Sequence, residues 1–387
     1  MGEHFCVTPD DLIAFAWSAP MRDLAAKVGL SDVGLRKLLR SHGVVTPPQG
    51  YWNRVHAGRK VPARPRAPAR GPGSSNRIRL DPRFTGLIPD AGPFPVNGPF
   101  ASALVPESLD ELRAAVRTKI SRVGVPQLKN GHHAALDDLI RRETRRREKH
   151  ASDRWADPPQ FDTPYWQRQL RLFNALFLAL ARHGGGGSLH DAAGGMDARA
   201  RAGDTVMTLV LEPVGRVRTE MRAGRHRPAS DLPARTPLAL LIDAGHRREP
   251  FARHADDDTG TLEQKLPDIV ADVITAGEAA FRRGLREQQE WIGQSIRMRA
   301  DAETRERAAV EAARGERLTA QAAALREADD IRTLVARVAA SSGDTDPAAV
   351  AAWSAWALAR ADRLDPVVSG EMFAAFAVAR GLEPDLT

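Results

Sequence analysis

The segment from Met21 to Arg40 constrains the fold more than any other part of the chain, because its small and apolar residues match a helix, a tight turn and a second helix. Gly29 stands where the turn needs a positive φ angle, which glycine adopts at little cost. Ser31 can cap the second helix, and Gly43 can end it. The pattern predicts a helix-turn-helix, with an unrelated helical hairpin as the alternative.

Apolar spacing predicts which faces of these helices point inward. A preceding helix begins at Thr8-Pro9, and the inward residues are Leu12, Ile13, Ala16, Trp17, Leu24, Ala25, Val28, Leu30, Leu35 and Leu38. The outward face of the second helix would then be free to enter the major groove of DNA. The predicted DNA contacts on it are Ser31, Asp32, Arg36, Lys37 and Arg40. A merely solvated cationic face is the alternative.

Positive charge is concentrated in one short segment. Between Val33 and Leu80 there are eleven Lys or Arg and no Asp or Glu, which leaves 45 basic against 49 acidic residues elsewhere. Such an asymmetry is typical of a surface that binds a polyanion, most often nucleic acid. Six further predicted DNA contacts lie there: Arg54, Arg59, Lys60, Arg64, Arg66 and Arg70. Residues 61–76 are rich in Pro, Ala and Gly, so a flexible basic linker is the alternative to an arm that follows the DNA backbone.

Tyr51 and Trp52 are adjacent aromatic residues in a chain that is only 5% aromatic. We expect them to staple the basic arm onto the preceding helices, with stacking on a base as the alternative.

Several motifs together resemble a family of uncharacterised bacterial proteins. They are W-S-A-P-M (Trp17 to Met21), L-S-D-V-G-L (Leu30 to Leu35), P-P-Q-G-Y-W (Pro47 to Trp52) followed by A-G-R-K, and, more faintly, L-E-Q-K-L-P-D-I-V (Leu262 to Val270). In that family a W-S-x-P-M helix-turn-helix is followed by a P-P-x-G-Y-W arm and a long C-terminal helical region. The resemblance implies a domain order and not a mechanism.

The whole chain is predicted to be mainly α with a small α+β middle domain. Helices are expected near Glu107–Val123 and His133–His150 and from Asp162 onward, with strands at Thr205–Leu211 and Pro237–Asp243 and a short one near Met196–Ala202. These strands would form a small antiparallel sheet. The expected domains are a helix-turn-helix domain (1–60), a basic Pro/Gly-rich arm and linker (61–106), the middle domain (107–260), a long helix or helical hairpin (261–341) and a C-terminal helical segment (342–387).

No catalytic motif, metal site or cofactor site is predicted. The glycine run Gly184–Gly187 lacks the Lys and Ser/Thr of a P-loop, so we expect a flexible turn. His132 and His133, with Asp137 and Asp138, are at a helical spacing that metal ligands can have, but without cysteine partners or an H-E-x-x-H pattern we expect surface histidines. A metal-dependent nuclease would need carboxylates such as Asp204, Glu212 and Asp243, which lie near predicted strand ends.

The chain from Leu266 onward is predicted to form a long, coiled-coil-like helix, either continuous or broken near Gly315. Its apolar stripe would support a homodimer or a protein partner, and packing against C-terminal helices at 347–360 and 371–380 is the alternative. With Cys6 as the single cysteine and no apolar run of membrane-spanning length, the sequence predicts a cytoplasmic protein without a membrane partner.

The leading hypothesis is a protein of transcription-regulator or mobile-element type that binds double-stranded DNA and is therefore associated with the nucleoid. Its recognition helix would lie in the major groove and its basic arm on the DNA backbone. A DNA-recruited interaction scaffold, including a defence-related one, is the first alternative. A metal-dependent nuclease is the second.

Overall fold

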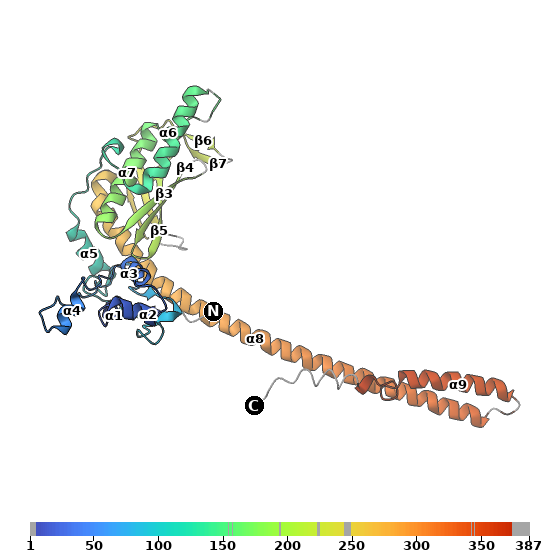
Figure 1. Ribbon diagram of the computed structural model, residues 1–387. Helices are drawn as coiled ribbons and strands as arrows, with labels where there is room; N and C mark the ends of the chain where they lie inside the picture. The colour runs from blue at the N-terminus through green and yellow to red at the C-terminus, as the bar shows by residue number, and fades with distance from the viewer. Residues whose placement is uncertain are drawn as a thin grey trace. The chain divides into compact units, whose positions relative to one another are not determined.

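A computed structural model describes residues 5–373, except 154, 157, 193–194, 223–224, 244–248, 342 and 344 (Figure 1). The chain divides into two compact units, Met1–Glu290 and Trp291–Thr387, and helix α8 (Leu262–Ser341) begins in the first and ends in the second. More than half of the chain is helical, and one sheet has five antiparallel strands. The prediction of a mainly α chain with a small antiparallel sheet and a long C-terminal helix is confirmed at this level.

Three short helices open the first unit: α1 (Pro9–Ala16), α2 (Met21–Lys27) and α3 (Asp32–Ser41). Their ends follow from local chemistry, because the Thr8 hydroxyl accepts from the Asp11 amide and the Ser31 hydroxyl accepts from the Gly34 amide. Gly29 follows α2 with a φ angle of 64°, and Gly43 follows α3 with a φ angle of 72°. The predicted caps and turn glycines are therefore confirmed.

The core of these helices contains more of the chain than the sequence indicated. Leu39 is fully buried, whereas Leu38, which was expected to point inward, is only partly buried. Strand β1 (Cys6–Val7) pairs antiparallel with β2 (Ile78–Arg79), and Phe84 in the 3₁₀ helix η1 (Pro82–Phe84) is fully buried in the same core. Residues 78–88, expected to belong to a linker, thus pack against the N-terminal helices.

A five-stranded sheet forms the centre of the middle region. Its order is β3 (Gly186–Ala192), β4 (Gly195–Ala202), β5 (Thr205–Pro213), β8 (Leu238–Asp243) and β9 (Ala252–Ala255), while β6 (Thr219–Arg222) and β7 (Arg225–Pro228) form a separate hairpin. Helix α7 (Pro164–Arg182) lies along one face of the sheet, and its apolar side chains share a core with the sheet and the first turns of α8 (Figure 1).

The glycine run after α7 was predicted to be a flexible turn, and only its beginning is a turn, where Gly184 has a φ angle of 77°. Gly186 and Gly187 are the first residues of β3, which the sequence analysis missed. A Cβ atom at Gly187 would lie 2.1 Å from Cδ1 of Phe177 on α7. Glycine therefore lets the strand pass directly over the helix.

The remaining helices of the first unit agree with the sequence, with α5 at Leu109–Lys119 and α6 at Asp137–Ser152. Short 3₁₀ helices, η2 (Leu128–Asn130) and η3 (Ala134–Leu136), lie between them, and α4 (Tyr51–His56) follows the N-terminal helices. Among the described helices, none combines the length and apolarity needed to cross a bilayer.

The second unit is a helical hairpin made by the end of α8 and α9 (Pro347–Leu364). Arg332 of α8 donates to Asp362 at 3.0 Å and to Asp365 at 2.8 Å, and Ala328 and Ala361 are fully buried. Helix α8 continues without a break at Gly315. The predicted helix at 371–380 lies largely outside the described residues.

Candidate nucleic-acid interface

The predicted DNA contacts on α3 and at its N-cap are all exposed: Ser31, Asp32, Arg36, Lys37 and Arg40. Ser31 is already engaged, because its hydroxyl accepts from the Gly34 amide as the helix cap. Asp32 lies in the first turn, where a negative charge stabilises the positive end of the helix dipole but would repel a phosphate. The three cations are consequently the residues of this face that suit DNA.

Helix α4 is held against α1 by aromatic contacts. The rings of Trp17 and Tyr51 meet edge to face at 5.1 Å, and those of Tyr51 and Trp52 at 5.3 Å. The Trp17 indole also donates to the carbonyl of Val45 at 2.8 Å, just before the diproline that precedes α4. These contacts form the expected staple, and they fix Arg54 of α4 relative to the N-terminal helices.

Residues 57–77, hereafter the basic strap, follow α4. Its exposed cations are Arg59, Lys60, Arg64 and Arg66. The backbone amide of Ala67 donates to the Asp10 carboxylate at 3.1 Å, and the Ala67 side chain packs on the N-terminal core. The strap is thereby anchored beside α1. It would therefore lose less conformational entropy on binding a partner than a flexible linker would.

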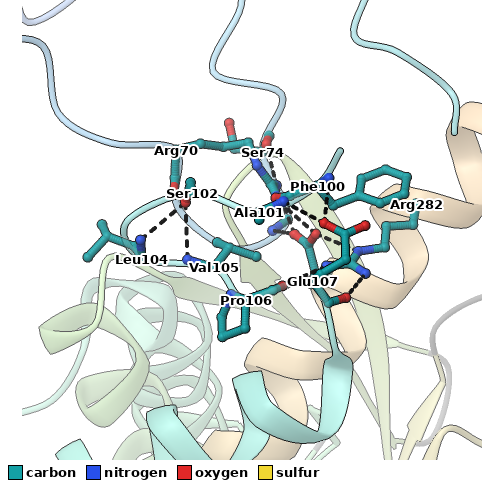
Figure 2. Close-up of polar contacts among 12 residues, drawn as sticks. Arg70, Ser74, Phe100, Ala101, Ser102, Leu104, Val105, Pro106, Glu107 and Arg282 are labelled. Atoms are coloured by element: carbon teal, nitrogen blue, oxygen red, sulfur yellow. Dashed lines mark hydrogen bonds and ion pairs between the residues drawn. The ribbon is translucent and has the colours of Figure 1, made fainter. Parts of the chain in front are cut away.

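Arg70 is a correction to the predicted DNA-facing set. Its side chain is only 7% exposed, and its two terminal nitrogens lie 2.8 and 3.0 Å from the carboxylate oxygens of Glu278 on α8. It also donates to the backbone carbonyls of Phe100 and Ser74 (Figure 2). With these partners Arg70 is a buried structural residue that cannot reach a phosphate.

Glu278 joins two arginines in this buried cluster. It is fully buried and accepts from Arg70, from the Gly73 amide and from Arg282. Burial alone would raise the pKa of its carboxyl, but the hydrogen bonds from Arg70, Gly73 and Arg282 hold that pKa below its ordinary value. The carboxylate is therefore kept ionised.

Arg282 completes the cluster from the opposite side. Its guanidinium donates to the backbone carbonyls of Glu107 and Pro106 and lies 4.5 Å from the ring centre of Phe100 (Figure 2). The Glu107 carboxylate in turn accepts from the amides of Phe100 and Ala101. The cluster thus joins the basic strap, the segment 100–107 and α8.

Glycine lets the strap approach the sheet closely. Gly73 has a φ angle of 71°, and a Cβ atom there would lie 2.3 Å from the carbonyl oxygen of Ala202. The Gly73 carbonyl accepts from the amide of Asp204 and from the hydroxyl of Thr205, in and just after the β4–β5 turn. The strap therefore lies against that turn as well as α8.

Sequence reasoning missed Glu278 and its role as the anchor of the strap. Its partner Arg70 is 208 positions away, so no local pattern links them. The available signal was a lone acidic residue within the otherwise apolar and small stretch Val273–Phe281. Such a residue needs a partner when the stretch is buried.

Two of the carboxylates considered for a nuclease, Asp204 and Glu212, lie far apart. Asp204 and Glu212 are near opposite ends of β5, about 27 Å apart at 3.4 Å per residue. Asp204 accepts from the Ser74 hydroxyl at 2.6 Å. No group of three or more His, Cys, Asp or Glu residues in the described part of the chain could hold a metal ion.

The two adjacent histidines also have local roles. His132 lies 2.8 Å from the Asp137 carboxylate, and a His133 ring nitrogen accepts from the Ala135 amide as the cap of η3. Burial lowers the pKa of His133, which favours its neutral form.

Comparison with known proteins does not assign a function to this surface. No family model, no curated protein and no solved structure matches this chain.

Proposed function

We propose that this chain binds double-stranded DNA through α3, α4 and the basic strap, as a protein of transcription-regulator or mobile-element type. One observation carries the proposal. Eight exposed Lys and Arg side chains in these elements have no hydrogen-bond or ion-pair partner in the described structure: Arg36, Lys37, Arg40, Arg54, Arg59, Lys60, Arg64 and Arg66. Their charges are therefore available to an external polyanion.

The arrangement of the helices supports a helix-turn-helix within this proposal. Helices α2 and α3 share a core and are joined by a short turn with glycine in the left-handed conformation. In that motif the second helix enters the major groove, which would be α3 with Arg36, Lys37 and Arg40. Arg64 and Arg66 on the anchored strap would then contact phosphates and carry little sequence information. The same proposal implies a cytoplasmic protein associated with the nucleoid.

Salt dependence tests the electrostatic part. Affinity for a duplex of random sequence, measured by fluorescence anisotropy, should fall with salt at a slope of about −0.9 per phosphate contact. Arg64→Ala with Arg66→Ala should reduce that slope by about 2. A wild-type affinity that does not change with salt would contradict the proposal.

Sequence selection tests the groove assignment. A random-oligonucleotide selection with the wild type should enrich a defined site, and Arg36→Ala, Lys37→Ala and Arg40→Ala together should abolish the enrichment. The matched control removes three exposed cations of α8, Arg297, Arg299 and Arg307, and should leave the selected site unchanged. Loss of enrichment in both triple variants would assign the effect to total charge instead of α3.

A DNA-recruited interaction scaffold is the second candidate, and it rests on α8. Trp291, Ile296 and Met298 are 57%, 64% and 70% exposed on this helix, which is unusual for side chains of this size. Within this candidate they would bind a second copy of the chain or another protein. Selection of no preferred DNA sequence would favour it over the regulator.

A further inference from the structure

Helix α3 exposes one apolar side chain among its charged ones. Val33 is 56% exposed. Among the residues of α1, α2 and α3, all of which lie in the described part of the chain, it is the only large hydrophobic side chain that is exposed. Leu35 and Leu39 of the same helix are fully buried. Val33 therefore faces away from the core that these helices share.

Helical geometry places Val33 in the middle of the outward face of α3. Successive residues of an α-helix are about 100° apart around its axis, so Val33, Lys37 and Arg40 fall within about 60° of one another. Leu35 and Leu39 lie on the opposite side of the helix, about 200° and 240° from Val33. The centre of the outward face is thus apolar at its N-terminal end and cationic beyond it.

The neighbours of Val33 in the sequence do not occupy this position. Gly34 has no side chain, and the Ser31 hydroxyl accepts from the Gly34 amide as the helix cap. Asp32 projects about 100° away from Val33. Of the four residues from Ser31 to Gly34, only Val33 has a side chain at the centre of the outward face.

A DNA duplex offers one apolar partner to a side chain at this place. When a recognition helix enters the major groove, its N-terminal residues contact the edges of the bases. The apolar group on those edges is the 5-methyl group of thymine, and 5-methylcytosine carries the same group. Lys37 and Arg40, about one and two turns further along α3, suit the N7 and O6 acceptors of guanine.

We propose that Val33 contacts the 5-methyl group of a pyrimidine in the major groove and so determines specificity at one position of the recognised site. This inference rests on the DNA-binding function proposed above. Lys37 is about 6 Å from Val33 along the helix axis, and base pairs are about 3.4 Å apart. The pyrimidine should therefore lie within about two base pairs of a guanine that binds Lys37.

The experiment is a random-oligonucleotide selection with the full-length protein, followed by fluorescence anisotropy on the selected duplex. The wild type should enrich thymine at one position near an enriched guanine, and Val33→Ala should lose the thymine preference and keep the guanine. Replacing that thymine with uracil removes only the methyl group, so wild-type binding should weaken by about fourfold, the effect of one buried methyl. Val33→Ala should bind the thymine and uracil duplexes equally well.

A second pair of duplexes, with cytosine or 5-methylcytosine at the same position, distinguishes the two sources of the methyl group. A protein that recognises thymine should bind the thymine duplex more tightly than the 5-methylcytosine duplex, and one that recognises methylated cytosine should show the reverse order. With either source, Val33→Ala should remove the difference between the methylated and unmethylated member of each pair.

Val45→Ala is the matched control, because Val45 is 64% exposed and lies after the end of α3. This variant should keep the wild-type base preference. Val33→Ala should keep or raise the wild-type melting temperature, since alanine favours a helix more than valine does. A loss of base preference in Val33→Ala would then not be due to unfolding.

Two results would overturn this inference and leave the DNA-binding proposal intact. They are an enriched site that is identical for the wild type and Val33→Ala, and equal affinity of the wild type for the thymine and uracil duplexes. A wild type without affinity for any duplex would overturn both.

Discussion

Arg64 and Arg70 lie in the same basic segment, yet their environments are opposite. Arg64 is exposed and has no side-chain partner among the described residues, whereas Arg70 is buried on Glu278. The difference is not in the local sequence, because both arginines follow alanine in a stretch of Pro, Ala and Gly. It arises because the backbone at Arg70 passes α8, where a buried carboxylate needs a cation.

Glu278→Gln should destabilise the protein by about 3 kcal/mol, because it leaves Arg70 and Arg282 buried without a full counter-charge. Urea denaturation measures this. The control is Glu287→Gln on the same helix, whose carboxylate is 57% exposed and pairs with Arg283 at 3.3 Å. Its loss should change stability by less than about 1 kcal/mol. Equal stability of the two variants would contradict a structural role for Glu278.

Acid should destabilise the first unit through the same carboxylate. The pKa of Glu278 is lower in the folded protein than its ordinary value of 4.5, so the ionised form stabilises the fold above that value. This contribution is lost as the pH falls below about 4.5 and through the folded-state pKa. Asp272 should act in the same direction: burial raises its pKa, but hydrogen bonds from His254 and Arg113 lower it below its ordinary value.

The measurement is the urea midpoint of unfolding as a function of pH. The wild type should lose stability over the acidic range, and Glu278→Gln should lose less because it has no proton to take up at this position. Parallel curves for the two proteins would show that Glu278 does not titrate in that range.

At the scale of elements, glycine decides where the basic strap can lie. The segment Gly71-Pro72-Gly73 reads as a flexible turn, and only one of its glycines is sterically required. Gly73 has a positive φ angle and faces the Ala202 carbonyl, whereas a Cβ atom at Gly71 would meet nothing within 4 Å. The two positions therefore provide a matched pair.

Gly73→Ala should destabilise the protein by about 2–3 kcal/mol, since the added methyl overlaps the β4–β5 turn and the backbone conformation disfavours a side chain. Gly71→Ala should be close to neutral. Chemical denaturation distinguishes them, and a small effect at Gly73 would mean that the strap is not held against the sheet.

At the scale of the whole molecule, the central part of α8 is largely exposed in the described structure. From residue 291 to residue 320 the described helix has no buried residue, although Trp291, Ile292 and Ile296 are apolar. Ile292 and Ile296 are four residues apart and so lie on the same face. We propose that this face mediates self-association, which would bring two copies of the proposed DNA-binding surface to paired half-sites.

Ile292→Glu with Ile296→Glu should shift the molar mass from dimer to monomer in light scattering after size exclusion, because like charges would meet in the interface. Ala308→Glu with Ala312→Glu, which has the same spacing on the same helix, is the control and should have a smaller effect. A monomeric wild type at all concentrations would remove the dimer from the proposal.

The sequence by itself determined the features that depend on neighbours within a few positions. The ends of α1 and α3, the glycine after α2 and the apolar stripe of α7 follow from capping, backbone conformation and helical spacing. These are local interactions, and their partners are visible in one stretch of sequence. The ten exposed members of the predicted DNA-facing set were likewise identified from local charge and periodicity.

Only the tertiary structure decided the features whose partners are distant. The pairing of β1 with β2, the burial of Phe84 and the placement of Gly187 over Phe177 depend on chain segments that meet only after folding. The Met21–Arg40 segment was readable because its turn and caps are local. Arg70 was misassigned because the carboxylate that binds it belongs to Glu278, 208 positions away in the sequence. A buried charge is identified by its partner and not by its neighbours in the sequence.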